Sequence, residues 1–419
     1  MKQHLLLLAL LATTLAASAQ LKPRPDAFPP VAETLATKAI TMASSVDEMA
    51  SWDRYPSYET YVAMMQRWAE QYPEICSLDT IGTSVQGRLI LAVQIEGQRL
   101  ADVYKPQFFY SSTIHGDEVT GYVMMLRLID TLLASYGNSP RLTALVDEVG
   151  IYINPLANPD GTYRRGNHTV RGAIRYNADT VDLNRTFPDP FSGVAAKAVP
   201  QENQAMIDYV SAHRFRLSAN LHGGAEVMNY PWDSFTSTMR PHPEAEWWQE
   251  VCKRFVDTCR LQSRSYLRDV TESGYTAGGD WYVIGGGRQD YMNHYHNCLE
   301  LTMEISTAKT VPSEQLPTYW HYLNAALINY IGEIYTLPGT EGIADRSASL
   351  IQVYPNPTIN SVVVRGLQQG ERLELLDITG RSLATLTAGG TPMLVDLGNL
   401  PRGIYLLRTG NQCAKVVKH

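Results

Sequence analysis

The chain contains little cysteine, and the spacing of its cysteines does not indicate cysteine chemistry. The five cysteines among 419 residues are an odd number, so at least one has no partner within the chain. Cys252 and Cys259 fall in a helix-like stretch, where seven residues of rise separate them by about 10 Å, too far for a disulfide. No C-x-x-C spacing occurs, so the cysteines do not predict a structural zinc site.

The chain also lacks long basic runs, repeats and low-complexity tracts. Its formal net charge is −7 and its charged content is 18%. We therefore expect no nucleic-acid partner. No stretch reaches about 18 uninterrupted apolar residues, so the sequence predicts no transmembrane segment.

The N-terminus has the pattern of a secretory signal peptide over residues 1–19. Lys2 gives a short positive region, Leu5–Leu11 is apolar, and Ala17-Ser18-Ala19 offers small residues for cleavage. We expect the mature protein to be soluble and outside the cytoplasm.

The length predicts two or three folded units. Residues 20–51 form a Pro-containing leader, expected to be loosely ordered at first and too short for a folded prodomain. Residues 52–336 form the main unit. Residues 337–349 are small, polar and Gly-containing, as in a linker, and residues 350–419 form a C-terminal unit.

Strands and helices alternate in the main unit. This pattern predicts an α/β fold with a mixed, mostly parallel central sheet and helices on both faces. The predicted strands are Leu78–Gly82, Leu89–Ile95, Phe108–Ile114, Val149–Leu156, Phe215–Leu221 and Cys298–Ile305. The predicted helices are Tyr58–Gln71, Val119–Tyr136, Gln201–Ala212, Trp247–Arg260 and Tyr319–Tyr335.

The C-terminal unit shows only short β-like runs separated by turn pairs such as Thr379-Gly380 and Gly389-Gly390. It therefore reads as a small all-β sandwich. The predicted runs are Ile351–Tyr354, Ser361–Val364, Leu373–Ile378, Leu383–Leu386, Met393–Val395 and Gly403–Leu407.

Possible metal ligands follow two of the predicted strands. His115 and Glu118 come after one strand, and His222 ends another strand 107 residues beyond His115. Ligands in open α/β sheets bind outside the carboxyl ends of strands, and three protein ligands leave a position open in a catalytic zinc site. Taken alone, each motif also fits a polar helix cap or a structural hydrogen bond.

The stretch from Arg175 to Pro188 carries two arginines and the carboxamide of Asn184. Guanidinium forks suit carboxylates and developing oxyanions, so this loop indicates anion recognition rather than a solvated face.

These motifs together closely resemble the zinc metallocarboxypeptidases, and most nearly the regulatory branch that includes carboxypeptidases N, E, M and D. The resemblance covers roughly residues 55–335. It rests on these segments in this order: His115–Glu118, Asn158–Gly161, Arg175–Pro188, Ser218–Gly224, Asn229–Asp233, Trp281-Tyr282, Gln289-Asp290 and Cys298–Glu304.

The resemblance implies a carboxypeptidase-like fold and a Zn²⁺ ion held by His115, Glu118 and His222. It also implies that Glu304 is the general base, which takes a proton from the attacking water and passes it to the leaving amine. Arg175, nine residues before Asn184 as in this branch, would stabilise the oxyanion.

Three further residues would hold the substrate's terminal carboxylate. The resemblance assigns this role to Asn184, Arg185 and Tyr282, and Tyr282 precedes Glu304 by 22 residues, as in the family. A guanidinium that needs a carboxylate is not satisfied by a mid-chain amide, which explains exopeptidase action. Tyr275 and Tyr291 are expected to be packing residues.

The resemblance to the regulatory branch implies that Asp233, eleven residues after the third metal ligand, lines the pocket for the last side chain of the substrate. A buried carboxylate there would favour Lys or Arg, and Gln289 matches a second polar pocket residue. Arg288 departs from the branch, in which an apolar residue, often Met, is common at this position. We expect Arg288 to face solvent, since an inward Arg288 would oppose a basic side chain. Glu300 is expected to be a strand-edge carboxylate facing solvent.

The C-terminal unit contains the segments Val353–Thr358, Asp377–Arg381, Gly403–Leu407 and Lys415–Lys418. These segments resemble a type IX secretion sorting domain rather than a transthyretin-like domain. The resemblance implies a secreted or cell-surface protein, exported through the periplasm of a Gram-negative bacterium with the type IX machinery as partner. A generic adhesive or carbohydrate-binding module is the alternative.

The sequence thus favours a secreted zinc carboxypeptidase that removes Lys or Arg from peptide and protein C-termini. A broad-specificity or murein-peptide carboxypeptidase of the same fold is one alternative. A non-catalytic peptide-binding protein with a degenerate site is another, disfavoured because every expected catalytic residue type is present.

Overall fold

The computed structural model describes residues 39–97, 105–189, 191, 198–338, 351–378, 380–390, 392–409 and 412–419. The predicted signal peptide, the predicted leader up to residue 38 and the predicted linker from residue 339 lie outside this part of the chain. Among the helices described, none has the length and apolar character needed to cross a bilayer.

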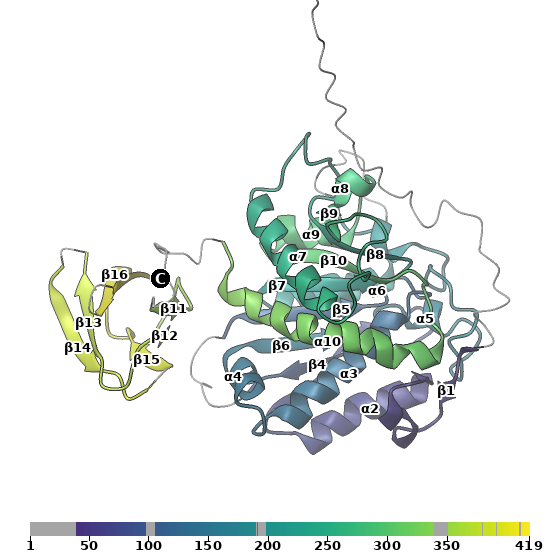
Figure 1. Ribbon diagram of the computed structural model, residues 1–419, viewed down its shortest axis with the longest axis horizontal. Helices are drawn as coiled ribbons and strands as arrows, with labels where there is room; N and C mark the ends of the chain where they lie inside the picture. Colours follow the sequence, from purple (N-terminus) through teal and green to yellow (C-terminus); the bar gives the residue numbers. More distant parts are fainter. Residues whose placement is uncertain are drawn as a thin grey trace, which may run out of the picture.

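An eight-stranded sheet forms the centre of the larger unit (Figure 1). Its strand order is β3-β4-β6-β5-β7-β10-β8-β9. The inner neighbours β6, β5, β7 and β10 pair in parallel, whereas β3-β4, β4-β6 and β10-β8 are antiparallel. The predicted mixed, mostly parallel sheet is therefore confirmed. The strands are β3 Cys76–Thr83, β4 Leu89–Ile95, β5 Gln107–Ser112, β6 Gly150–Asn154, β7 Phe215–His222, β8 Ala225–Tyr230, β9 Tyr275–Ala277 and β10 Leu299–Ser306.

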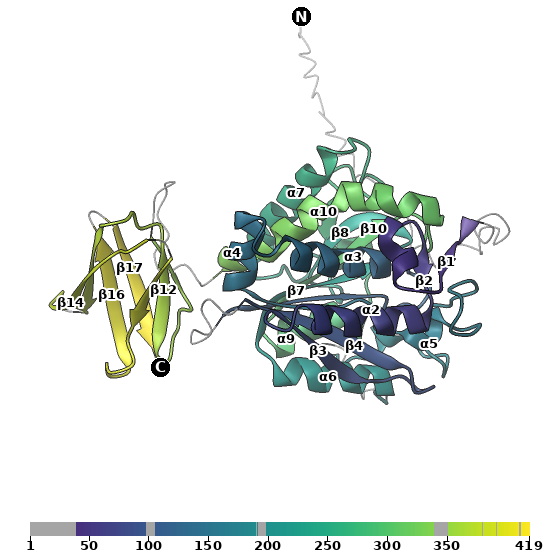
Figure 2. The same cartoon turned by 90° about the horizontal axis from the view of Figure 1, so that it is seen from below.

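Helices cover both faces of this sheet. Figure 2 shows α3, α7 and α10 on one side and α6 and α9 on the other. The longer helices are α2 Tyr58–Gln71, α3 Thr120–Ser135, α4 Pro140–Glu148, α6 Gln201–Ala212, α7 Ala245–Arg260, α9 Arg288–Tyr295 and α10 Leu316–Gly332. The short ones are α5 Pro159–Thr162, α8 Gly278–Trp281, η3 Asp47–Ser51, η4 Leu183–Arg185, η5 Ser313–Gln315 and η6 Glu333–Tyr335.

The alternation of side chains along β5 divides the core into two layers. Phe108 and Tyr110 are buried with the helices of one face, and Phe109 is buried with α6 and α9 on the other. Since successive strand residues point to opposite faces, a continuous apolar run suits a strand covered on both sides. This burial explains the apolar run Phe108–Tyr110 at the centre of β5.

Every strand and helix predicted for the main unit is present, with ends shifted by up to three residues. The sequence did not predict α4, β8, β9 or α9. Strand β8 follows β7 directly and pairs on the far side of β10, so β10 is an interior strand. The placement of β10 determines the surroundings of Glu300 and Glu304.

Part of the predicted leader packs against the larger unit. Strand β1 Met42–Ala43 pairs in parallel with β2 Tyr55–Pro56, and Ala43 and Met49 are buried in the main core. The described residues from about 40 onward thus contribute to this core ahead of residue 52.

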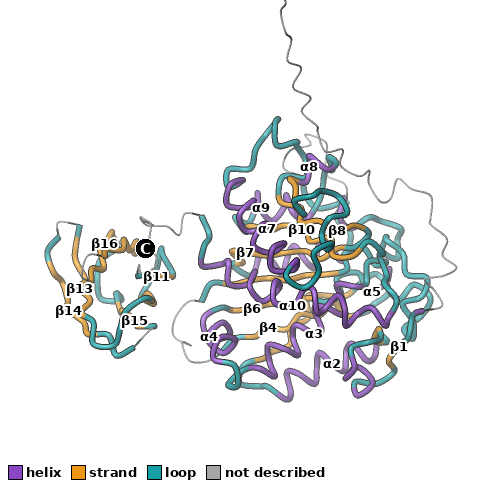
Figure 3. Tube along the Cα trace, in the orientation of Figure 1, coloured by secondary structure: helices purple, strands orange, loops and turns teal. Residues whose placement is uncertain are grey.

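The C-terminal residues form two small antiparallel sheets around a separate core of Val, Leu and Ala side chains. The described part of this unit contains strands and loops (Figure 3). The predicted runs are confirmed, and β17 adds a strand that the sequence did not predict. The strands are β11 Gln352–Tyr354, β12 Ser361–Arg365, β13 Arg372–Asp377, β14 Ser382–Thr387, β15 Met393–Asp396, β16 Gly403–Thr409 and β17 Gln412–Lys418.

Candidate active site

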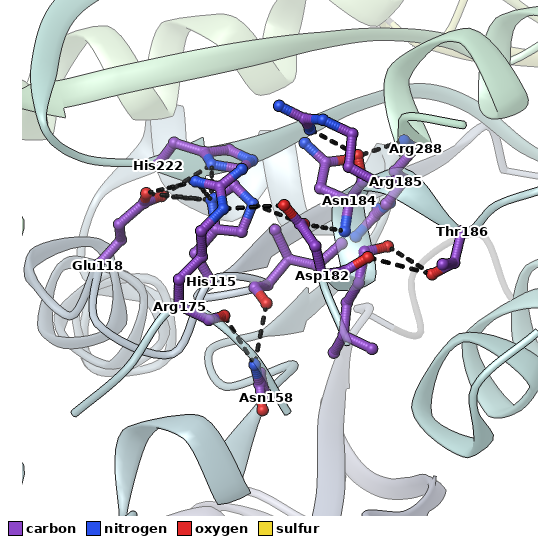
Figure 4. A network of polar contacts seen from close by, with 12 residues as sticks. His115, Glu118, Asn158, Arg175, Asp182, Asn184, Arg185, Thr186, His222 and Arg288 are labelled. Carbon is purple, nitrogen blue, oxygen red and sulfur yellow. Dashed lines mark hydrogen bonds and ion pairs between the residues drawn. The ribbon is translucent and has the colours of Figure 1, made fainter. Parts of the chain in front are cut away.

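His115, Glu118 and His222 meet at the carboxyl ends of β5 and β7. These two strands are parallel neighbours, so the loop after β5 and the last residue of β7 reach the same edge of the sheet. The His115 Nδ1 atom lies 3.0 Å from Glu118 Oε1, and His222 Nδ1 lies 2.8 Å from Glu118 Oε2. One ligand atom from each residue can be chosen within 4.8 Å of the others (Figure 4).

The donor set of this triad fits zinc. Two imidazole nitrogens and a carboxylate oxygen, all buried, are the usual ligands of a catalytic zinc site with one open position. Burial lowers the pKa of His222 to about 4, against the opposing effect of Glu118, so the imidazole is neutral, as a metal ligand requires. Although burial acts to raise it, the pKa of Glu118 is held well below its ordinary value by the two histidines.

Asn158 holds the two loops that carry these groups. Its amide Nδ2 donates to the carbonyl of Ile114 at 3.2 Å and to the carbonyl of Arg175 at 3.3 Å. Its Oδ1 accepts the N–H of Gly161 at 2.9 Å and caps α5. The Asn158–Gly161 segment therefore joins the His115 loop to the Arg175 loop (Figure 4).

Asp182 is a site residue that the sequence reasoning missed. One carboxylate oxygen lies 3.3 Å from His115 Nε2, and the other accepts Arg175 Nε at 2.9 Å. Burial acts to raise the pKa of Asp182, but His115 and then Arg175 hold it well below its ordinary value. A carboxylate between two arginines in the Arg175–Pro188 stretch was the available signal. Asp182 orients both the predicted ligand His115 and the predicted oxyanion residue Arg175.

Glu304 lies beside the triad on the neighbouring strand. Strand β10 pairs in parallel with β7, with Glu304 directly opposite His222, and the side chain of Glu304 is buried. Burial, followed by the charge of Glu118, raises the pKa of Glu304 well above its ordinary value, while Lys309 and Arg175 act in the opposite direction. A cation bound at the triad would also favour the carboxylate.

The predicted carboxylate-binding residues line the same pocket. Asn184 and Arg185 belong to η4, and Arg185 Nη1 donates to the Asn184 carbonyl at 2.7 Å. Tyr282 follows α8 and lines the pocket with them. Arg175 Nη1 lies 3.2 Å from His115 Nδ1, so the guanidinium adjoins the proposed metal position.

Asp233 forms the far wall of the site, and Gln289 lies directly behind it. Gln289 Nε2 donates to Asp233 Oδ1 at 3.0 Å, and Asp233 is buried. Burial, followed by the neighbouring Asp290, raises the pKa of Asp233 well above its ordinary value. A Cβ at Gly278 would lie 1.9 Å from Asp233 Oδ1, so the glycine is required to keep this wall open.

Two predictions about neighbouring residues were wrong. Arg288 does not face solvent: its side chain has no exposed area and pairs with Glu300 at 3.0 Å. Glu300 is not at a sheet edge, because β10 is an interior strand. Its side chain is also fully buried, since Arg288 of α9 and Ser218 of β7 contact its carboxylate. Tyr291 is confirmed as a packing residue, buried against α6.

Lys309 is a second residue missed by the sequence reasoning. Its Nζ lies 3.1 Å from Asp117 Oδ2 and 3.5 Å from Glu118 Oε1, and it lines the pocket. It follows Glu304 in a loop with no charged pattern, so no sequence signal pointed to it. The pocket thus combines all the predicted site residues except Gln289, whose contact with Asp233 places it immediately behind the wall.

Comparison with known proteins defines the class. The zinc carboxypeptidase family matches residues 61–325, and the secretion system C-terminal sorting domain family matches residues 352–419. The chain therefore belongs to the zinc carboxypeptidase family and carries a C-terminal sorting domain of the type IX kind.

Individual relatives agree with this membership. Mouse carboxypeptidase D is 32% identical over 314 residues, which cover 71% of this chain but 22% of that protein. Mouse carboxypeptidase M is 34% identical over 302 residues, 67% of this chain and 66% of that protein. The chain thus spans about a fifth of the length of the carboxypeptidase D relatives. The crystal structure of thrombin activatable fibrinolysis inhibitor shares the fold, with a TM-score of 0.60 at 17% identity, covering 70% of this chain and 77% of that chain.

Proposed function

We propose that this protein is an exported zinc carboxypeptidase that releases the C-terminal residue, preferentially Lys or Arg, from peptides and proteins. The carrying observation is one pocket lined by the His-Glu-His triad, Glu304, the Asn184–Arg185 pair and Asp233. Residues 52–336 would be the catalytic domain and residues 350–419 the sorting domain for the type IX machinery. The signal peptide and sorting domain support export through the periplasm of a Gram-negative bacterium to the surface or medium.

The terminal residue of the substrate would be held at two points. The guanidinium of Arg185, the amide of Asn184 and the hydroxyl of Tyr282 bind the terminal carboxylate. The side chain of that residue lies against Asp233, which Gln289 supports from behind, and a buried carboxylate there favours a cation. Because Asp233, Asp290 and Glu300 are all buried near this wall and Arg288 is paired with Glu300, the inward Arg288 does not make the pocket repel a basic side chain.

The reaction then depends on groups already in place. His115, Glu118 and His222 would hold the zinc ion, which when bound would supply Lewis-acid chemistry toward a carbonyl and a water molecule. Glu304 takes a proton from the attacking water and delivers it to the nitrogen of the leaving residue. Arg175 donates to the oxygen of the scissile carbonyl as that carbon becomes tetrahedral. The amide bond breaks, giving a shortened peptide and a free amino acid.

A panel of peptides that differ only in the last residue tests this function. We expect Arg- and Lys-ended peptides to be cleaved fastest, amidated peptides to be left intact, and a chelator to abolish cleavage until zinc is restored. Faster cleavage of a Phe-ended peptide, or of murein peptides, would replace this proposal with the broad-specificity or murein alternative. Zinc-loaded protein that binds peptide without cleaving it would indicate a non-catalytic binding protein.

The role of Asp182 gives a second prediction. Asp182→Asn should weaken zinc binding about 10- to 100-fold, because the carboxylate beside His115 orients the ring and increases its basicity. The measurement is the zinc dissociation constant in competition with a chelating dye. Asp179→Asn, an exposed neighbour in the same loop, is the matched control and should bind zinc normally. Equal zinc affinity in both variants would contradict this role for Asp182.

A further inference from the structure

Arg288 is a buried cation directly behind the substrate pocket. Its Nη2 donates to Glu300 Oε2 at 3.0 Å, and the same oxygen accepts the hydroxyl of Ser218 at 2.7 Å. The guanidinium carbon lies 5.0 Å from the centre of the Phe109 ring. Arg288 therefore contacts β5 through Phe109 and β10 through Glu300, and Glu300 in turn contacts β7 through Ser218.

The backbone of Arg288 contacts a residue proposed to bind substrate. Its N–H donates to Asn184 Oδ1 at 2.9 Å. With the oxygen of the Asn184 amide occupied in this way, the Nδ2 group is the end available to donate to a substrate carboxylate. The backbone of Arg288 thus determines that the nitrogen end of the Asn184 amide, rather than the oxygen end, is turned toward the substrate.

The two residues after Arg288 continue the pattern at the beginning of α9. Gln289 Nε2 donates to Asp233 Oδ1, and the Asp290 carboxylate accepts the N–H groups of Asp233 and Ser234 at 2.8 and 2.9 Å. Three successive residues of one helical turn therefore contact both substrate-binding parts of the pocket. Arg288 contacts Asn184, which is proposed to bind the terminal carboxylate, and Gln289 and Asp290 contact Asp233.

The anchor of this turn lies on the strand that carries the proposed base. Glu300, Thr302 and Glu304 alternate along β10 and share one face, which looks toward α9 and the pocket. Asn293 of α9 adds a second link, donating to the Glu300 carbonyl at 2.8 Å. A shift of α9 along β10 would therefore displace both substrate-binding walls relative to Glu304.

We propose that Arg288 is a positioning residue whose ion pair with Glu300 fixes the first turn of α9, so that Asn184 and Asp233 hold the substrate in register with Glu304. This inference rests on the proposed function and assigns a role to a residue that departs from the regulatory branch.

The contacts of the pair argue against stability as its only role. Arg288 Nε and Nη1 and Glu300 Oε1 are buried and have no hydrogen-bond partner among the described residues. A buried ion pair with unsatisfied atoms is often no more stabilising than a packed apolar pair. What the ion pair adds over an apolar contact is direction, because a guanidinium-carboxylate contact has a preferred geometry.

The test is peptide binding by the full-length, zinc-loaded protein in a Glu304→Gln background, measured by titration calorimetry with a Lys-ended peptide. Adding Arg288→Met should raise the dissociation constant about tenfold. With Glu304 intact, Arg288→Met should raise KM by a similar factor and also lower kcat, because a substrate held out of register with Glu304 binds less tightly and reacts more slowly. Arg254→Met, which removes a surface arginine paired with Glu333, is the matched control and should not change binding.

Two more variants keep the test decisive if Arg288→Met folds poorly. Arg288→Lys retains the charge without the fork and should bind between wild type and Arg288→Met. Arg288→Met/Glu300→Gln removes both buried charges and should fold, yet it should bind as weakly as Arg288→Met. A lowered melting temperature with unchanged dissociation constant and KM would overturn the proposal, as would wild-type binding by the folded double variant.

The failure of this inference can be told apart from failure of the proposed function. If the parent Glu304→Gln protein does not bind the Lys-ended peptide, and the wild type does not cleave it, the proposed function itself is wrong. If the parent binds and every Arg288 variant binds equally, only the role of Arg288 is wrong.

Discussion

Glu304→Gln should reduce kcat by about three orders of magnitude while the protein still binds zinc and peptide. The amide has nearly the same shape as the carboxylate but cannot accept the proton of the attacking water, and general-base catalysis contributes about 10²- to 10⁴-fold. Zinc should remain because the ligands His115, Glu118 and His222 are unchanged. The measurements are turnover of an Arg-ended peptide and the zinc content of the purified variant.

Glu314→Gln is the control for this experiment. Glu314 is an exposed carboxylate in η5, away from the residues that line the pocket, so its variant should have wild-type turnover. Near-normal activity of Glu304→Gln would contradict the assignment of the base. Loss of zinc from that variant would show that Glu304 belongs to the metal site instead.

Asp233→Ala should reduce kcat/KM for Lys- and Arg-ended peptides by about 100-fold and change apolar-ended peptides little. Removing one partner of a buried charge pair costs roughly 2 to 5 kcal/mol, because the remaining charge is left without compensation. The measurement is the ratio of kcat/KM for peptides that end in Arg and in Leu. Equal losses on both substrates would remove Asp233 from the specificity role.

The pH dependence of this preference follows from the same side chain. Burial and the neighbouring Asp290 raise the pKa of Asp233, so in the free enzyme it becomes neutral at a higher pH than an exposed aspartate. The preference for basic ends should therefore be complete above that raised pKa and fall as the pH decreases through it. Asp280→Asn, a carboxylate that binds the surface residue Ser237, is the control and should keep the wild-type ratio.

The parts of the site that were predicted from sequence depend on short-range patterns. His115 and Glu118 are three residues apart after an apolar strand, and His222 ends another, so a parallel sheet brings them to one edge. Asn184 and Arg185 are adjacent in one loop. Such groups are visible because the chain order and the strand direction alone place them together.

The parts that were wrong depend on contacts that no local pattern records. Whether Glu300 faces solvent is decided by α9 and β7, whose residues Arg288 and Ser218 contact its carboxylate. Arg288 is buried because its partner Glu300 lies on a different element that crosses beneath α9. From sequence alone, a charged residue is expected to be exposed, because charged side chains are rarely buried without an oppositely charged partner and the sequence does not identify that partner.

The arrangement of the pocket walls has a stereochemical consequence. Three groups of residues line the pocket: Asn184 and Arg185, which would bind the terminal carboxylate; the acidic wall at Asp233; and the triad with Glu304. These walls would hold the carboxylate, the side chain and the scissile amide, which are three of the four substituents on one carbon atom. A mirror-image residue can satisfy two of them but not the third. The proposed site should therefore be stereoselective for the alpha carbon of the last residue and should distinguish a peptide ending in L-lysine from one ending in D-lysine.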